Sequence, residues 1–148
     1  MKMVKVKTAE LVGAQLDWAV ALADGRAGSD DDEEAVPGKL YWCPSSSPAK
    51  GYAPAQHVGP SQINPETGWH FGRYSPSTDW ALAGPIIERE HLQMLFDADN
   101  PESERWGAIN DRTGNCEQGS TPIIAACRTY VAMRLGDEVE VPALEGGQ

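Results

Sequence analysis

Basic side chains are scarce in this 148-residue sequence, which has 12 Lys and Arg against 22 Asp and Glu and a net charge of −10 at pH 7. Proteins that bind duplex nucleic acid contact its phosphates through clusters of Lys and Arg, so we expect no direct binding to duplex nucleic acid. Long apolar runs are absent too, since none reaches the roughly 18–20 residues that span a membrane. We therefore expect no membrane partner.

Cysteine and histidine are also rare, and neither shows the spacing of a metal site. The three Cys include no CxxC pair, which argues against a disulfide framework or a zinc ribbon. The three His include no pair at helical ligand spacing, although zinc needs three or four converging ligands. The phosphate-binding patterns GxGxxG and GxxxxGK[ST] are absent. We therefore expect the protein to bind no metal and no cofactor, and to reside in a reducing cytoplasm.

Hydrophobic periodicity predicts two long helices, at Thr8–Ala23 and Ser120–Leu135. Thr8 is the predicted cap of the first helix, and Thr121-Pro122 is a typical start for the second. Strands are predicted at residues 1–7, 39–43, 69–73, 92–96, 106–109 and 137–141, with short helical turns beginning at Ser77 and Pro85. This order favours an α+β fold with two long amphipathic helices packed on a small, mostly antiparallel sheet, joined by long irregular loops.

The chain is predicted to be one domain over residues 1–148, with three less regular parts. Five consecutive acids at Asp30–Glu34 repel one another and predict a mobile acidic loop at about 26–37. The stretch 44–76 is rich in proline, which excludes a long helix but does not define its structure. The tail at about 142–148 is predicted to fray.

The most informative block is Tyr74–Trp80, which combines two aromatics, three hydroxyls and a carboxylate. It has two interpretations. It is either a rigid capped turn whose Trp80 fills the core, with Asp79 paired to an arginine, or one wall of a polar pocket for a small ligand or peptide. On a helical wheel Asp17 points away from the apolar stripe of the first helix, so Asp17-Trp18 would form the opposite wall. Arg128 lies on the flank of the last helix. The residues proposed to contact a ligand or partner are Asp17, Trp18, Tyr74, Ser75, Ser77, Thr78, Asp79, Trp80 and Arg128.

No catalytic residue is assigned. Cys127 falls on the apolar stripe of the last helix, where a small buried side chain is the simpler interpretation than a reactive thiolate. Cys116 lies in a stretch, Asn110–Gly119, that is predicted to be a polar loop. The GxSxG nucleophile motif is absent.

Three blocks of sequence resemble the NinX-like family of small proteins encoded by tailed phages and prophages. They are residues 6–20, residues 74–80 with 84–90, and residues 121–131 with 135–142, and they occur in the order of the family. The resemblance implies a phage or prophage protein of unassigned activity in the cytoplasm of a bacterial host. The acidic segment and the proline-rich stretch are longer than the connections typical of the family.

Two functions follow as hypotheses. The first is a non-catalytic accessory protein that binds a host protein or a small polar, nucleotide-like ligand, because an acidic surface complements basic surfaces on host factors. The alternative is a small enzyme that acts on a nucleotide or related metabolite at the Tyr74–Trp80 block. The sequence leaves the oligomeric state open.

Overall fold

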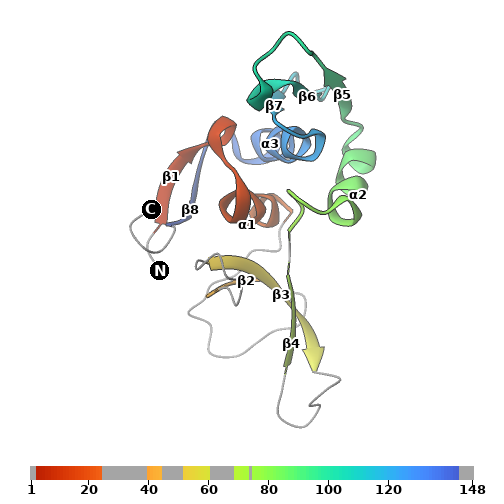
Figure 1. Cartoon of the computed structure of the whole chain (residues 1–148). Coiled ribbons are helices and arrows are strands. Elements are labelled where there is room, and N and C mark those ends of the chain that lie inside the picture. The colour runs from red at the N-terminus through yellow and green to blue at the C-terminus, as the bar shows by residue number, and fades with distance from the viewer. Residues whose placement is uncertain (1–2, 25–39, 45–51, 61–68, 74, 144–148) are drawn as a thin grey trace.

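The computed structural model describes residues 3–24, 40–44, 52–60, 69–73 and 75–143. Over these residues the fold is α+β, with three α-helices and three small antiparallel sheets (Figure 1). The predicted acidic loop at 26–37 and residues 144–148 of the predicted frayed tail lie outside the described residues. The elements are β1 (Met3–Lys7), the 3-10 turn η1 (Thr8–Glu10), α1 (Gly13–Ala23), β2 (Leu40–Pro44), β3 (Tyr52–Pro60), β4 (Trp69–Arg73), α2 (Trp80–Glu90), β5 (Gln93–Phe96), the 3-10 turn η2 (Glu102–Glu104), β6 (Trp106–Ile109), β7 (Cys116–Gly119), α3 (Pro122–Leu135) and β8 (Glu138–Pro142).

Helix α3 lies at the centre of the described fold, with α1 on one side and the β5–β6–β7 sheet on the other (Figure 1). Its residues Cys127, Tyr130 and Val131 join α1 in the larger apolar core, which also includes β8. Ala125 and Ala126, on another face, pack in a second core against β5 and β6. Because α3 is buried on two sides, its apolar residues do not form a single stripe.

The two ends of the described chain pair as a two-stranded ribbon, β1 with β8. The register sets Val4 opposite Val141 and Val6 opposite Val139, and these valines pack against the larger core. The intervening positions set Lys5 opposite Glu140 and Lys7 opposite Glu138. Opposite charges directly across a strand pair stabilise its register. Both strands were predicted from alternation, and both are confirmed.

The second sheet contains the predicted hairpin of β5 and β6, which is confirmed with Phe96 opposite Trp106. A third strand, β7, was not predicted, because Cys116–Gly119 was assigned to a polar loop. That assignment is wrong. The segment has no apolar alternation of its own, and it is held as a strand by pairing with β6 and by the backbone N–H of Glu117, which donates to Thr129 Oγ1 at 3.1 Å.

The third sheet has the order β2–β3–β4 and lies beyond α1, on the side away from β5–β7 (Figure 1). Its outer strands β2 and β4 fall where the sequence predicted strands. The central strand β3 crosses the proline-rich stretch that the sequence left undefined, and it packs against α1. The register shifts between His57 and Gly59, which is a bulge against β4.

Two predicted helix boundaries are wrong. The first helix begins at Gly13 and not at Thr8, because residues 8–10 form a separate 3-10 turn and Leu11 is extended and fully buried. The Thr8 hydroxyl does not cap a helix but donates to the Gly136 carbonyl at 2.7 Å. The segment Gly84-Pro85 was predicted to divide two helical turns, yet α2 runs through it. Gly84 has no Cβ to clash with the proline ring, which eases helical geometry before a proline.

The predicted pair of long amphipathic helices is not confirmed. Helix α1 has 11 residues, of which six in a row, Leu16–Ala21, are buried. This continuous burial follows from its place between α3, the ribbon and β3. The start of α3 has the predicted features, because Thr121 Oγ1 accepts from the Ile124 N–H at 3.2 Å and Pro122 occupies the first turn.

Gly119 should tolerate no side chain. A Cβ at this position would lie 2.8 Å from Ile124 Cγ2 and 2.9 Å from the Ala125 backbone nitrogen. We expect Gly119→Ala to lower the free energy of unfolding by about 1–3 kcal/mol, the range for overpacking. Gly107→Ala is the matched control in the neighbouring strand β6, because the nearest atoms to a Cβ there, the Glu117 carbonyl oxygen and Leu95 Cβ, lie 3.9 Å away, at ordinary van der Waals distance. Urea denaturation measures both, and equal stability of the two variants would contradict the tight approach of β7 to α3.

Candidate functional site

The turn at residues 75–79 starts helix α2, and its polar groups serve that start. Asp79 is the N-cap: its carboxylate accepts from the Ala81 N–H at 2.9 Å. The N–H of Thr78 donates to the Ser75 carbonyl at 3.1 Å, which closes the turn. Asp79 was predicted to pair with an arginine if it were structural. Its partner is instead backbone, as expected of an aspartate at this position.

Helix α1 contacts the buried side of this turn. The Asp17 carboxylate accepts from the Ser77 N–H at 2.8 Å, and both residues are buried. A buried carboxylate requires such a donor. The structure therefore brings together the two walls that the sequence proposed, Asp17 and the Tyr74–Trp80 block, through direct contact. Ser77 Oγ, also buried, has no hydrogen-bond partner in the described part of the chain.

The outer side of the turn faces solvent. Thr78 and Asp79 are exposed, and 55% of Trp80 is exposed. The alternative in which Trp80 fills the core is therefore wrong. A tryptophan of α1, Trp18, does lie in the core and is only 3% exposed. Tyr74 lies outside the described residues.

Arg128 has a different position from the other predicted site residues. Its Nε donates to the Leu11 carbonyl at 2.9 Å and its guanidinium also donates to the Gln118 carbonyl at 2.6 Å. Burial lowers the pKa of Arg128, an effect that Glu117 partly opposes. Arg128 thus links α3 to the extended bend before α1 and to β7, and none of its hydrogen bonds reaches the turn at 75–79.

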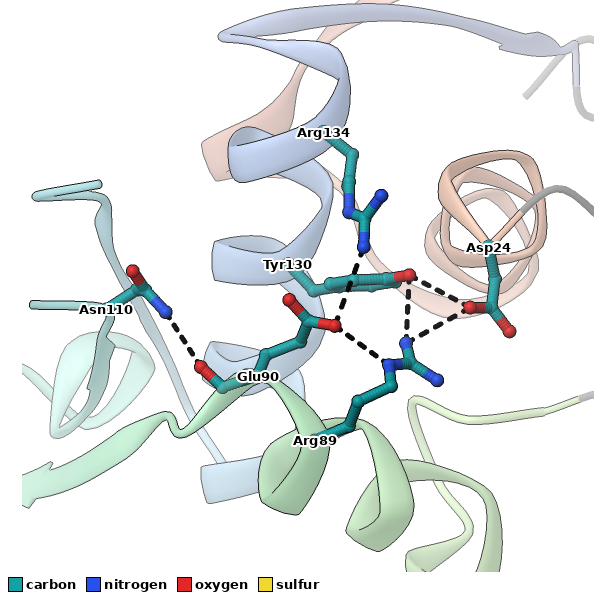
Figure 2. Close-up of polar contacts among 6 residues, drawn as sticks. All are labelled: Asp24, Arg89, Glu90, Asn110, Tyr130 and Arg134. Atoms are coloured by element: carbon teal, nitrogen blue, oxygen red, sulfur yellow. Dashed lines mark hydrogen bonds and ion pairs between the residues drawn. The ribbon is translucent and has the colours of Figure 1, made fainter. Parts of the chain in front are cut away.

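A second polar group, which we call the Arg89 cluster, lies where the three helices meet (Figure 2). It consists of Asp24, Arg89, Glu90, Tyr130 and Arg134. Arg89 donates from Nε to Glu90 at 2.8 Å, and its terminal nitrogen contacts both Asp24 at 3.1 Å and the Tyr130 hydroxyl at 3.0 Å. The Tyr130 hydroxyl donates to Asp24 at 2.9 Å. Both guanidiniums lie 5.5 Å from the Tyr130 ring centroid.

Electrostatics in the Arg89 cluster favours the charged forms of its ions. The Arg89 hydrogen bond lowers the pKa of Glu90, with a further contribution from Arg134 at 3.6 Å. The hydrogen bond to Glu90 raises the pKa of Arg89. Burial, followed by the bond to Asp24, raises the pKa of Tyr130 to about 12, so its hydroxyl stays protonated as a donor. With every charge paired, the cluster joins helix ends and presents no reactive group.

Sequence reasoning missed the Arg89 cluster because its members belong to three helices far apart in the chain. Two signals were available. Tyr130 stands in an apolar stripe with a hydroxyl that needs a partner when buried, and Arg89 and Arg134 lie in the last turns of their helices. Asn110 was missed as well. It is buried, and its side-chain amide donates to the Glu90 carbonyl at 2.7 Å, although it lies in a stretch predicted to be a polar loop.

An open cavity of about 450 Å³ lies where the end of β1 meets β7 and β8. It is lined by Lys7, Thr8, Ala9, Glu117, Asp137 and Glu138. Burial raises the pKa of Glu117, and the negative charge of Asp137 raises it further. The cavity is thus mainly acidic, and it is separate from the turn at 75–79.

The described residues contain no group of three or more side chains arranged to hold a metal ion. Of the two cysteines described with side chains, Cys127 is buried, and burial raises the pKa of its thiol, as expected for a packed side chain. Cys116 is exposed. None of the helices in the described ranges has the length and apolar character needed to cross a bilayer.

Glu90→Gln should weaken the fold in a pH-dependent way. A carboxylate whose pKa is lowered on folding adds stability above its ordinary pKa, near 4.5, and this contribution is lost as the pH falls through the lower folded value. We expect the substitution to cost about 1–3 kcal/mol at pH 7, with the difference from the wild type shrinking towards pH 3. Chemical denaturation at several pH values measures it. A pH-independent cost would show that the Glu90 charge has no role.

The chain matches a family model described as Bacteriophage P22, NinX, over residues 7–134. This match covers η1, α1, α2, the two three-stranded sheets and α3 as far as Arg134, the residue before its last. It does not reach β8. No curated protein sequence matches the chain.

Proposed function

The chain belongs to the bacteriophage P22 NinX family, and on this basis we propose that it is a non-catalytic phage accessory protein that binds a host protein in the cytoplasm of the bacterium. The observation that carries the proposal is the exposure of Trp80 at the start of α2. Tryptophan is enriched among the residues that dominate binding energy at protein interfaces. A tryptophan that is 55% exposed is therefore a suitable anchor for a partner.

The turn that carries Trp80 is held rigidly, which supports this role. The Asp79 cap fixes the first turn of α2, and the Asp17–Ser77 hydrogen bond ties the preceding residues to α1. An anchor that is ordered before binding loses less conformational entropy on association. In this proposal Thr78, Asp79 and Trp80 contact the partner. Asp17, Trp18, Ser75 and Ser77 position them, and Tyr74 is a further contact predicted from the sequence.

The net charge of −10 defines the kind of partner. An acidic protein is steered towards basic surfaces and away from nucleic acid phosphates. We therefore propose a host protein with a basic surface around an apolar pocket that accepts the indole. The alternatives are a small polar or nucleotide-like ligand bound at the same turn, and a small enzyme that uses such a ligand as substrate.

Trp80→Ala should abolish capture of the partner without unfolding the protein. We expect host proteins enriched by the wild-type chain from a lysate to fall at least about tenfold with the variant, equivalent to about 1.4 kcal/mol. Val12→Ala is the matched control, because Val12 is also 55% exposed but lies before α1. Quantitative mass spectrometry measures capture, and thermal denaturation checks folding.

Three outcomes would overturn the proposal. Equal capture by Trp80→Ala and the wild type would remove Trp80 as the anchor. Turnover of any member of a nucleotide and metabolite library by the purified chain would favour the enzyme alternative. A small molecule that co-purifies with the wild type, but not with Trp80→Ala, would identify a ligand in place of a host protein.

A further inference from the structure

Strand β5 has a free edge. The strand order β5–β6–β7 places β5 at one side of its sheet, and no described strand pairs with its outer side. Figure 1 shows β5 at the margin of the molecule, after α2. The opposite edge is different, because η2 packs beside β7 and the Glu117 N–H there is already bonded to Thr129. The sheet therefore has one edge able to accept another strand.

The backbone groups at this edge can be assigned from the register. The Asp97 N–H donates to the Arg105 carbonyl at 2.8 Å, so this opposed pair is hydrogen-bonded. In an antiparallel ladder, hydrogen-bonded and non-hydrogen-bonded pairs alternate. Leu95, opposite Gly107, therefore also bonds to β6, whereas Met94 and Phe96 direct their N–H and C=O groups towards the free edge.

The side chains of β5 make this edge unusual for an acidic protein. The strand reads Gln-Met-Leu-Phe and carries no charge. Leu95 is 51% exposed and Phe96 is 56% exposed. Free edges are normally protected by charged residues or proline against pairing with another chain. β5 carries neither charge nor proline, and only its short length of four residues limits such pairing.

We propose that two copies of this chain associate by antiparallel pairing of β5 with β5 of the second copy, which joins their sheets. The edge is self-complementary in one register. Met94 of one copy lies opposite Phe96 of the other, and their outward N–H and C=O groups bond to each other. Leu95 then lies opposite its own counterpart at the two-fold axis. Opposed residues share a face in this register, as antiparallel pairing requires.

This register covers the apolar side chains that the single chain exposes. Met94 and Phe96 lie on the face that packs towards α3, where the Phe96 ring already contacts Trp106 in a tilted arrangement at a centroid distance of 4.8 Å. In the pair, the Met94 thioether of one copy reaches the Phe96 ring of the other, a favourable sulfur–aromatic contact. The two Leu95 side chains meet on the outer face. No like charges face each other within the paired strands, despite the charge of −10 on each copy.

A second copy fits this edge because the same three residues, Met94, Leu95 and Phe96, supply both halves of every contact, as a two-fold interface demands. The paired segment is short, so the association is of the weak, concentration-dependent class. Trp80 begins α2 whereas β5 follows the other end of that helix, so the dimer and the proposed host contact use different residues and are tested separately.

The test uses the position on the two-fold axis. Residues opposed in a non-hydrogen-bonded pair have Cα atoms about 4.5 Å apart, so a charge at position 95 meets its own copy. We expect the wild type to shift from its monomer mass of 16.0 kDa to twice that mass in sedimentation equilibrium as concentration rises. Leu95→Glu and Leu95→Lys should each weaken association at least tenfold, because like charges directly opposite are destabilising.

Mixing the two variants supplies the decisive result. An equimolar mixture of Leu95→Glu and Leu95→Lys should restore the dimer, because opposite charges then face each other. Leu95 is exposed on the outer face, so circular dichroism should show both variants folded. Val12→Glu and Val12→Lys, which place the same charges on an exposed residue outside the sheet, should leave association unchanged.

Each of three results would overturn the proposal. The wild type could stay monomeric up to the highest soluble concentration, or both Leu95 variants could dimerise as the wild type does. A mixture of the two variants that remains monomeric would also exclude the two-fold register, and would leave the edge to a strand from another protein.

Discussion

Helix α3 is buried on two faces at once, and the arrangement of the other described elements depends on this packing. One face contributes Tyr130 and Val131 to the core shared with α1 and the β1–β8 ribbon, and another contributes Ala125 and Ala126 to the core under the β5–β6–β7 sheet. The small alanine side chains on the second face let the sheet approach α3 closely. Gly119 allows the same close approach at the start of the helix. A helix used in this way cannot carry a polar face of ordinary width.

Polar groups within the described fold are largely paired with one another. The Asp17 carboxylate accepts from the Ser77 N–H, and Arg128 donates to two backbone carbonyls. Arg89 donates hydrogen bonds to Asp24, Glu90 and the Tyr130 hydroxyl. Such groups stabilise the meeting points of helices, because a buried ion or hydroxyl left without a partner is costly. They are therefore poor candidates for chemistry on a substrate.

Two of the exposed surface features are apolar, and the proposals for binding rest on them. Trp80 stands on a rigid turn, and Leu95 and Phe96 lie on a strand with a free edge. These side chains belong to different elements, and we propose a different partner for each: a host protein for Trp80 and a second copy for Leu95 and Phe96. Both proposals draw on exposure and backbone geometry, and neither requires a catalytic group.

Local patterns were enough to predict several elements. Alternating valines predicted β1 and β8, and Thr121-Pro122 predicted the start of α3, because capping and strand alternation involve neighbours in the chain. The hairpin of β5 and β6 was predicted for the same reason. In contrast, β7 and the long strand β3 carry weak patterns, and only their pairing partners make them strands.

The sequence by itself determined the α+β class and the family. It also indicated that the Tyr74–Trp80 block is either a capped turn or one wall of a ligand pocket. Only the tertiary structure decided which side of that block is buried. Asp17 was predicted to face away from the apolar stripe of its helix, yet it is buried because the turn at 75–79 packs over it. Trp80 was a candidate core residue, yet it is exposed, whereas Trp18 of α1 lies in the core. A helical wheel describes one helix alone, whereas burial depends on which distant segments cover each face.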